Sequence, residues 1–225
     1  MMDKKAVIEK MIQDVSLSAQ FYILTIIAAT IAISGLLLNT TSFVIGAMLI
    51  SPLEVSIGLL GLCVATLDKS LLKKSLECLV AGAILVLLVT FLITFFCPHH
   101  HITPEILIRT RPSIYDLIVA TLAGSALGYI MMQENFHKHV GVIIGVGIVT
   151  SVLPPLATIG YGCAIRDYKI VLGAFILFFT NICAISLGSS FMFRYLGFDS
   201  HNKFSYYFLI TMIIFFSLFF LYIYL

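Results

Sequence analysis

The chain has 225 residues, of which 60% are hydrophobic and 11% charged, and its formal net charge is +2. A water-soluble domain carries about 25% charged residues. The low charged fraction of this chain and its mean hydropathy of +1.10 therefore exclude a soluble domain. Because lipid cannot hydrogen-bond an open backbone, the composition predicts an all-α polytopic membrane protein with the lipid bilayer as its surroundings. The sequence has no basic stripe with interleaved aromatic residues, so we expect no nucleic-acid partner.

Residues 1–19 precede the first apolar stretch. Val7, Met11 and Val15 recur at helical spacing, with charged residues on the opposite side. This pattern indicates a helix lying on the membrane surface or an ordinary cytoplasmic lead-in helix. The segment is too long and too mixed in charge for the start of a cleavable signal peptide.

Seven apolar stretches follow, each long enough to cross a bilayer. They are residues 20–38, 44–66, 73–96, 114–132, 140–164, 170–193 and 204–225. The connections are short except for the polar segment 98–113. We therefore expect a first three-helix repeat, a polar inter-repeat loop, a second three-helix repeat and a C-terminal transmembrane helix, over 20–97, 98–113, 114–197 and 198–225.

Prolines interrupt two of these stretches near mid-depth, at Ser51-Pro52 and at Pro154-Pro155. The two segments superpose when the sequence is shifted by 99 residues, which places Gly61 on Gly160. Each unit holds three spans, an odd number, so the second unit enters the membrane in the opposite sense. The pattern predicts a 3+3 inverted repeat whose two broken helices meet at mid-membrane, where transporters of this architecture bind their solutes.

The distribution of basic residues predicts the orientation. Nine Lys and Arg residues lie in loops on the side of the N-terminus and four on the other side. The positive-inside rule then places the N-terminus in the cytoplasm and the chain in the cytoplasmic (inner) membrane of a bacterium.

The two breaks form the candidate solute or ion pathway. A proline frees backbone polar groups, which at mid-depth are tolerated only inside protein or along a wet cavity. A small hydrophilic cavity between residues 50–56 and 150–158 is one reading; kinked helices whose gaps are filled by hydroxyl side chains are the other. The break residues concerned are Ser51, Pro52, Ser56, Thr150, Ser151, Pro154 and Pro155.

Glu54 and Asn181 are polar residues within these apolar stretches. A carboxylate at the bilayer centre costs about 2.5–3.5 kcal/mol on insertion scales and usually faces the interior of a bundle. Glu54 is therefore a candidate proton carrier or cation ligand, or a protonated acid hydrogen-bonded to a neighbouring helix. Asn181 is either an interhelical hydrogen-bonding residue or a substrate contact.

The polar segment carries a second candidate group. Arg109, Arg111 and Asp116 either form a charged vestibule for an entering solute or lock the loop to the start of the next helix. The run His99–His101 follows Cys97 and invites a metal hypothesis, but adjacent side chains point in different directions. We expect a solvated loop there, with no metal and no cofactor.

Four stretches resemble the domain-of-unknown-function family 389, hydrophobic membrane proteins of bacteria and archaea. They are Gly46 to Leu53, Arg109 to Ser113 with Asp116, Val152 to Ala157, and Thr180-Asn181 with Ala184-Ile185. The resemblance implies a membrane protein of bacterial type whose activity is not established. Family members usually carry a second proline where this chain has Ser56, two residues after Glu54.

The sequence contains no G-x-S-x-G, H-E-x-x-H, P-loop or dinucleotide motif, so we expect no enzyme. The interrupted repeat favours a secondary transporter or channel-like permease for a small solute or ion. The alternative is a membrane scaffold or sensor that does not transport. A homo-oligomer fits either reading.

Overall fold

The computed structural model describes residues 8, 12, 15–97, 101–132 and 152–198. Every regular element in these residues is an α-helix: α2 (Ala19–Leu37), α3 (Thr41–Ile50), α4 (Leu53–Thr66), α5 (Lys69–Phe96), α6 (Pro104–Ile108), α7 (Ile114–Met131), α9 (Leu153–Ile165) and α10 (Tyr168–Tyr195). The lead-in helix, the C-terminal span, Thr150 and Ser151 lie outside the described residues.

Four of these helices, α2, α5, α7 and α10, are long and apolar enough to cross a membrane. A fifth crossing is formed if α3 and α4 count as one bent span. These helices match five of the seven predicted stretches. Of the predicted span 140–164, only the part from residue 152 is described, and α9 itself has 13 residues. At 1.5 Å per residue α9 is about 20 Å long, which is too short to cross the hydrocarbon core alone.

Large apolar side chains are exposed along the outer surfaces of the long helices. Leu88 and Leu92 on α5, Leu122 on α7 and Phe175 on α10 are each about half exposed or more. An apolar surface of this extent is suited to lipid rather than to water. The apolar helices therefore identify the chain as a membrane protein.

The predicted break at Ser51-Pro52 separates two helices. Their axes differ by 57°. Pro52 is the residue that precedes α4, and the backbone N–H of Leu53 donates a hydrogen bond to Ser51 Oγ at 3.4 Å. The serine hydroxyl thus satisfies one of the backbone groups that the break leaves unpaired, as N-cap side chains do elsewhere.

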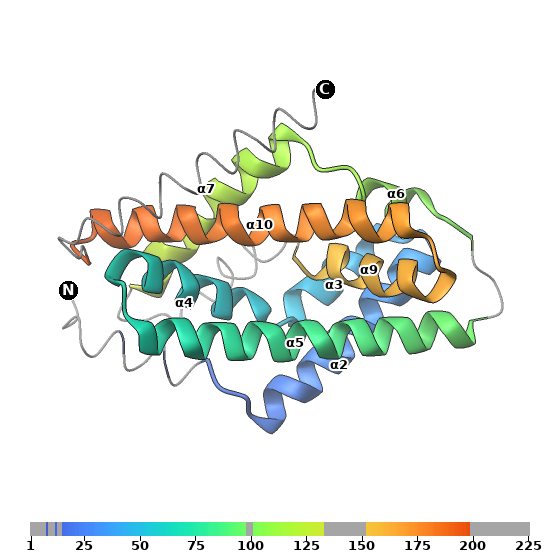
Figure 1. Cartoon of the computed structure of the whole chain (residues 1–225), viewed down its shortest axis with the longest axis horizontal. Coiled ribbons are helices and arrows are strands. Elements are labelled where there is room, and N and C mark those ends of the chain that lie inside the picture. The colour runs from blue at the N-terminus through green and yellow to red at the C-terminus, as the bar shows by residue number, and fades with distance from the viewer. Residues whose placement is uncertain (1–7, 9–11, 13–14, 98–100, 133–151, 199–225) are drawn as a thin grey trace.

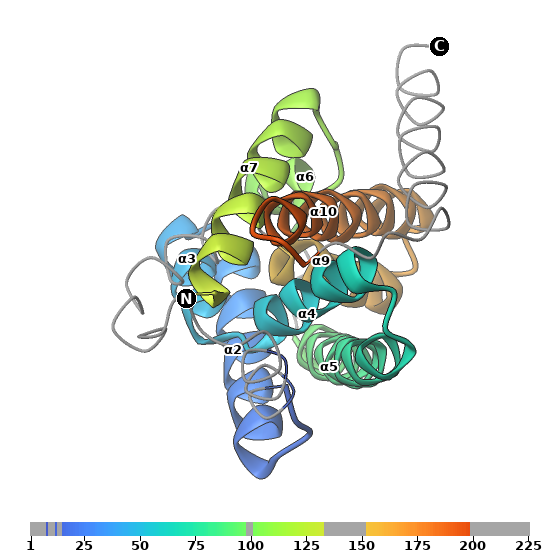
Figure 2. The ribbon, with the colours of Figure 1, turned by 90° about the vertical axis from the view of Figure 1, so that its left-hand side faces the viewer.

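The helices are arranged around two long ones that run antiparallel, α5 and α10 (Figure 1). The short helices α4 and α9 lie between them, begin near the middle of the molecule and run toward opposite ends (Figure 1). Each of α4 and α9 packs against both α5 and α10. Seen with α5 and α10 end-on, α2 and α7 flank this central group (Figure 2). α2 packs against α5 and α9, and α7 packs against α10.

The turns into α5 and α10 have the same construction. Leu67 and Arg166 adopt the left-handed conformation with φ of 60° and 59°. The next residues, Asp68 and Asp167, cap the following helices through hydrogen bonds from backbone N–H groups. The two aspartates therefore start the long helices, each of which then runs for 28 residues.

Glycines allow the short helices to approach the long ones, and they do so at equivalent positions. A Cβ added at Gly61 on α4 would collide with Ser189 Oγ on α10, and one added at Gly160 on α9 would collide with Thr90 Oγ1 on α5. The glycines are 99 residues apart in sequence, and so are their two hydroxyl neighbours. The spacing that relates the two segments in sequence therefore also relates their packing.

Candidate functional site

Glu54 lies in the first turn of α4, directly after the break. The residue is only 5% exposed, and its Oε1 atom has no hydrogen-bond partner in the described part of the chain. Ser56, two residues further on, is also buried. The structure thus encloses a carboxyl group near the middle of the molecule, where an apolar environment favours its neutral form.

The second break is packed differently. Pro154 and Pro155 stand in the first turn of α9, where the missing N–H groups are not needed for helical hydrogen bonds. All residues from Val152 to Gly162 are buried, so packed side chains surround the described part of this break. The helices α2, α5 and α10 all pack against α9. Thr150 and Ser151 lie outside the described residues, so the expected polar cavity between residues 50–56 and 150–158 stays a prediction.

A cavity of about 210 Å³ lies beside α7 and α10. It is lined by Ile108, Arg109, Arg111, Ser113, Asp116, Val119, Leu177 and Asn181. Four of these residues were singled out in the sequence as two separate groups. The cavity, termed the outer cavity below, brings the three charged residues of the polar segment together with Asn181.

The outer cavity runs from an exposed mouth to a buried floor. Arg111 and Ser113 are exposed at one side, whereas Asn181 is 3% exposed and Leu177 4%. Asn181 is in the middle of α10, and at 1.5 Å per residue it lies about 20 Å along the helix from Tyr168. The cavity therefore extends from the surface toward mid-depth.

Asp116 also fixes the start of α7. Its Oδ2 accepts hydrogen bonds from the backbone N–H and the hydroxyl of Ser113, both at 2.8 Å, and its own N–H donates to Ser113 Oγ at 3.3 Å. This reciprocal arrangement is a capping box. This is the contact expected if Asp116 locks the polar segment to the start of the next helix. The same carboxylate also lines the outer cavity.

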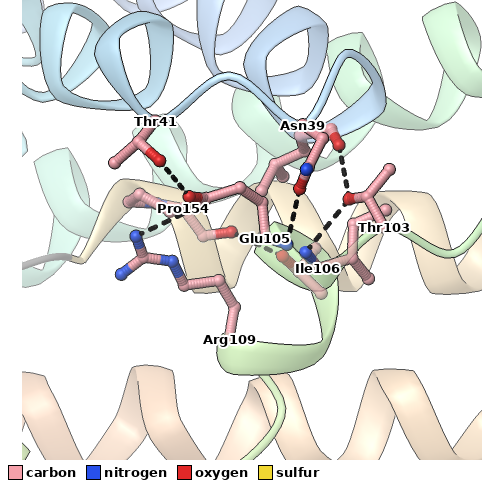
Figure 3. Close-up of polar contacts among 9 residues, drawn as sticks. Asn39, Thr41, Thr103, Glu105, Ile106, Arg109 and Pro154 are labelled. Atoms are coloured by element: carbon pink, nitrogen blue, oxygen red, sulfur yellow. Dashed lines mark hydrogen bonds and ion pairs between the residues drawn. The ribbon is translucent and has the colours of Figure 1, made fainter.

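Glu105 is a buried charged residue that the sequence analysis missed. Its carboxylate accepts a hydrogen bond from Thr41 Oγ1 and lies 3.5 Å from the guanidinium of Arg109 (Figure 3). Its backbone N–H donates to Asn39 Oδ1 at 3.2 Å. Glu105 therefore ties α6 to the turn between α2 and α3, and Pro154 at the start of α9 lies beside the Glu105–Arg109 pair (Figure 3).

Two signals in the sequence could have revealed this contact. Thr103 followed by Pro104 is a helix-start pattern, and Thr103 does cap α6. Glu105 and Arg109 are four residues apart, the spacing of an ion pair on a helix. The burial of the pair could not be read from these signals, because it depends on a distant segment of the chain.

The described residues contain no group of three or more His, Cys, Asp or Glu side chains that could hold a metal ion. His99 and His100 lie outside them, so the metal hypothesis for the histidine run is not addressed by the structure.

The profile of the family described as Domain of unknown function (DUF389) matches residues 48–187. The chain belongs to the DUF389 family. An uncharacterized protein of Methanocaldococcus jannaschii is 27% identical over 187 residues, which cover 83% of this chain and 57% of that protein. The chain thus spans a little over half the length of this archaeal relative. No solved structure matches the chain. The DUF389 match includes Glu54, both breaks and every residue of the outer cavity.

Proposed function

We propose that this DUF389 protein is a secondary transporter or channel-like permease for a small solute or ion. The single observation that carries the proposal is the buried carboxyl of Glu54, enclosed at the start of a half-helix near the centre of an apolar bundle. Ionisable residues in such positions are rare and commonly belong to proton relays or ion pathways. A purely structural core would be more stable with an apolar residue there.

The proposed architecture is a 3+3 inverted repeat with a seventh, C-terminal helix. It is supported by the antiparallel course of α5 and α10, by the equivalent turns before them and by the two glycine contacts (Figure 1). In inverted-repeat transporters the solute site lies between the repeats, at discontinuous helices. We assign the pathway to Ser51, Pro52, Glu54, Ser56, Thr150, Ser151, Pro154, Pro155 and Asn181.

In this proposal Glu54 binds a proton or a cation when water reaches it and releases it on the other side. An uncompensated carboxylate is unfavourable in an apolar environment, so Glu54 crosses the closed state either protonated or paired with a cation. Alternating exposure of the residue to the two sides would then couple the movement of a solute to an ion gradient. The mechanism requires no cofactor, and we propose no enzymatic activity and no nucleic-acid partner.

The proposed orientation places the N-terminus in the cytoplasm and the chain in the inner membrane of a bacterium. The start of α5 and the end of α10 lie at one end of the molecule, and α6 with the α9–α10 turn lies at the other (Figure 1). Among the described residues, the basic ones at the first end are Lys69, Lys73, Lys74 and Arg194, and those at the second are Arg109, Arg111, Arg166 and Lys169. The loops predicted to be cytoplasmic include the first group.

The test is ion-coupled flux in proteoliposomes. Purified full-length protein is reconstituted with an internal pH dye, and proton movement is followed while candidate anions, cations and neutral solutes are added outside. Glu54→Gln removes the ionisable group at nearly constant volume, and we expect it to abolish solute-dependent proton movement. Glu77→Gln is the matched control, because Glu77 is exposed on α5 and pairs only weakly with Lys73 at 3.8 Å. Unchanged coupling in Glu54→Gln would remove Glu54 from the mechanism.

A non-transporting scaffold or sensor is the second candidate, and one observation favours it. The described part of the second break is fully packed, since Val152 to Gly162 are all buried. A scaffold would be indifferent to Glu54→Gln in every flux measurement and would show no solute-dependent proton movement in the unmodified protein either. A homo-oligomer is compatible with both candidates.

A further inference from the structure

We propose that the outer cavity is a binding site for a small oxyanion, of the carboxylate or phosphate class. The cavity is lined by two guanidinium groups, one carboxylate and one amide, contributed by Arg109, Arg111, Asp116 and Asn181. Its volume of about 210 Å³ is sufficient for an anion of a few heavy atoms together with water. That such an anion is also the transported solute rests on the proposed function; its binding does not.

Two guanidinium groups and two carboxylates lie in or beside the cavity, so the available hydrogen-bond donors, rather than a net charge, favour an anion. Arg109 is largely compensated by Glu105, whose carboxylate lies 3.5 Å away on the side of the α2–α3 turn. Asp116 is engaged by two hydrogen bonds from Ser113. Arg111 makes no ion pair in the described part of the chain and stands exposed at the mouth. An incoming anion therefore meets a guanidinium whose donors are available, and a guanidinium presents a fork that suits carboxylate and phosphate oxygens.

The rest of the lining distinguishes a mouth from a floor. Ile108 and Val119 are apolar residues of the lining, and the buried residues Leu177 and Asn181 on α10 form the floor of the cavity. The buried Asn181 amide is an uncharged polar group at the far end of the cavity. Arg109 is shared between the cavity and Glu105, so its guanidinium is held in place from the opposite side (Figure 3). The Arg109 side of the site is therefore pre-formed.

The equivalent place in the other half is filled. Gly82 on α5 lies 99 residues before Asn181. A Cβ added there would lie 2.5 Å from Leu53 Cδ2 and 3.1 Å from Phe21 Cζ. Apolar side chains thus cover the α5 position, whereas the α10 position faces a cavity lined by charges. The outer cavity is a feature of the second half and not a general consequence of the packing.

The test is anion binding to the purified full-length protein in detergent, measured by isothermal titration calorimetry with acetate and with inorganic phosphate. Choline chloride serves as the cation probe, with ionic strength held constant. We expect saturable binding of at least one oxyanion at a stoichiometry of one and no binding of choline. Arg111→Gln should weaken the binding about tenfold, the effect of one charge-assisted hydrogen bond, and Arg111→Lys should restore part of it.

Lys169→Gln is the matched control, because it removes one exposed positive charge at the same end of the molecule without lining the cavity. Asp116→Asn should strengthen oxyanion binding, since it removes the only carboxylate of the lining while leaving an amide oxygen to accept from Ser113. Equal losses in Arg111→Gln and Lys169→Gln would overturn the proposal in favour of unspecific charge screening. Saturable choline binding, or no saturable oxyanion binding in the unmodified protein, would also overturn it.

The outcome separates this proposal from the proposed function. Oxyanion binding without solute-dependent proton movement in proteoliposomes would leave the site standing and refute transport. Transport that is insensitive to Arg111→Gln, in a protein that binds no oxyanion, would refute the site and leave transport standing.

Discussion

The pair α4–α5 and the pair α9–α10 share a framework but differ in chemistry. Both turn through a left-handed residue into a helix capped by aspartate, and both bring a glycine against a hydroxyl of the opposite long helix. At positions that correspond when the sequence is shifted by 99 residues, however, Glu54 is matched by Leu153, and Gly82 is matched by Asn181. The shared residues named above serve packing or capping, whereas Glu54 has no polar counterpart in the second half and Asn181 has none in the first. The departures from equivalence therefore mark the candidate functional positions.

The largest expected effect concerns the Glu54–Leu153 difference. Leu153 is fully buried in the first turn of α9. Leu153→Glu should lower the free energy of unfolding by about 3 kcal/mol, because an intramembrane carboxyl without a partner is costly. Glu54→Leu should leave stability unchanged or raise it, since it removes such a group. Thermal unfolding in detergent measures both. A strong destabilisation by Glu54→Leu would mean that the carboxyl has a structural role, contrary to the account.

The glycine contacts test the part that the halves share. Gly61→Ala and Gly160→Ala should each destabilise the protein by about 1–3 kcal/mol through overpacking. Removing the opposing hydroxyl should restore part of the loss, so Ser189→Ala should rescue the first variant and Thr90→Ala the second. Gly46→Ala is the control, because an added Cβ there meets no described atom within 4 Å. The two contacts would not be equivalent if Thr90→Ala rescued Gly61→Ala, if Ser189→Ala rescued Gly160→Ala, or if only one of the two glycine variants could be rescued.

The smallest expected effect concerns the two N-cap aspartates. Asp68→Ala and Asp167→Ala should each cost about 1 kcal/mol through loss of the N-cap. Hydrogen bonds from the Ser70 hydroxyl and from backbone N–H groups lower the pKa of Asp68 below its ordinary value. The stabilising contribution of Asp68 is thus fully present above about pH 4 and is lost as the pH falls through the lowered pKa.

Thermal unfolding between pH 7 and pH 3 measures this dependence. Ser70→Ala should move the loss to higher pH, because it removes the 2.6 Å hydrogen bond from the hydroxyl to Asp68 Oδ1. Asp68→Asn should flatten the profile over this range. An acid profile in Ser70→Ala identical to that of the unmodified protein would show that the hydroxyl has no influence on the titration.

Much of the fold follows from local sequence. The stretches 20–38, 73–96, 114–132 and 170–193 are long apolar runs, and each corresponds to one helix with ends shifted by a few residues. The first break was predictable because Pro52 cannot continue a helix. The start of α9 at Pro154-Pro155 was not predictable, because two adjacent prolines fit a kinked helix as well as the first turn of a helix.

The candidate site was predictable as separate residues but not as an assembly. Glu54 and Asn181 were identified because polar residues in apolar spans are unusual, and Arg109, Arg111 and Asp116 because they fit a family pattern. Their grouping in the outer cavity depends on how the polar segment folds over α10. Glu105 was missed for the same reason, since its contacts with Asn39 and Thr41 lie more than 60 residues away in sequence.

The central claim is that the two equivalent helix pairs cross the membrane in opposite directions, and labelling of single cysteines tests it most directly. Lys69→Cys and Tyr168→Cys, placed separately in a cysteine-free protein, occupy equivalent exposed positions directly after the capping aspartates. In intact cells a membrane-impermeant thiol reagent should label Tyr168→Cys from outside and should reach Lys69→Cys only after permeabilisation. Labelling of both positions from the same side would contradict the inverted arrangement.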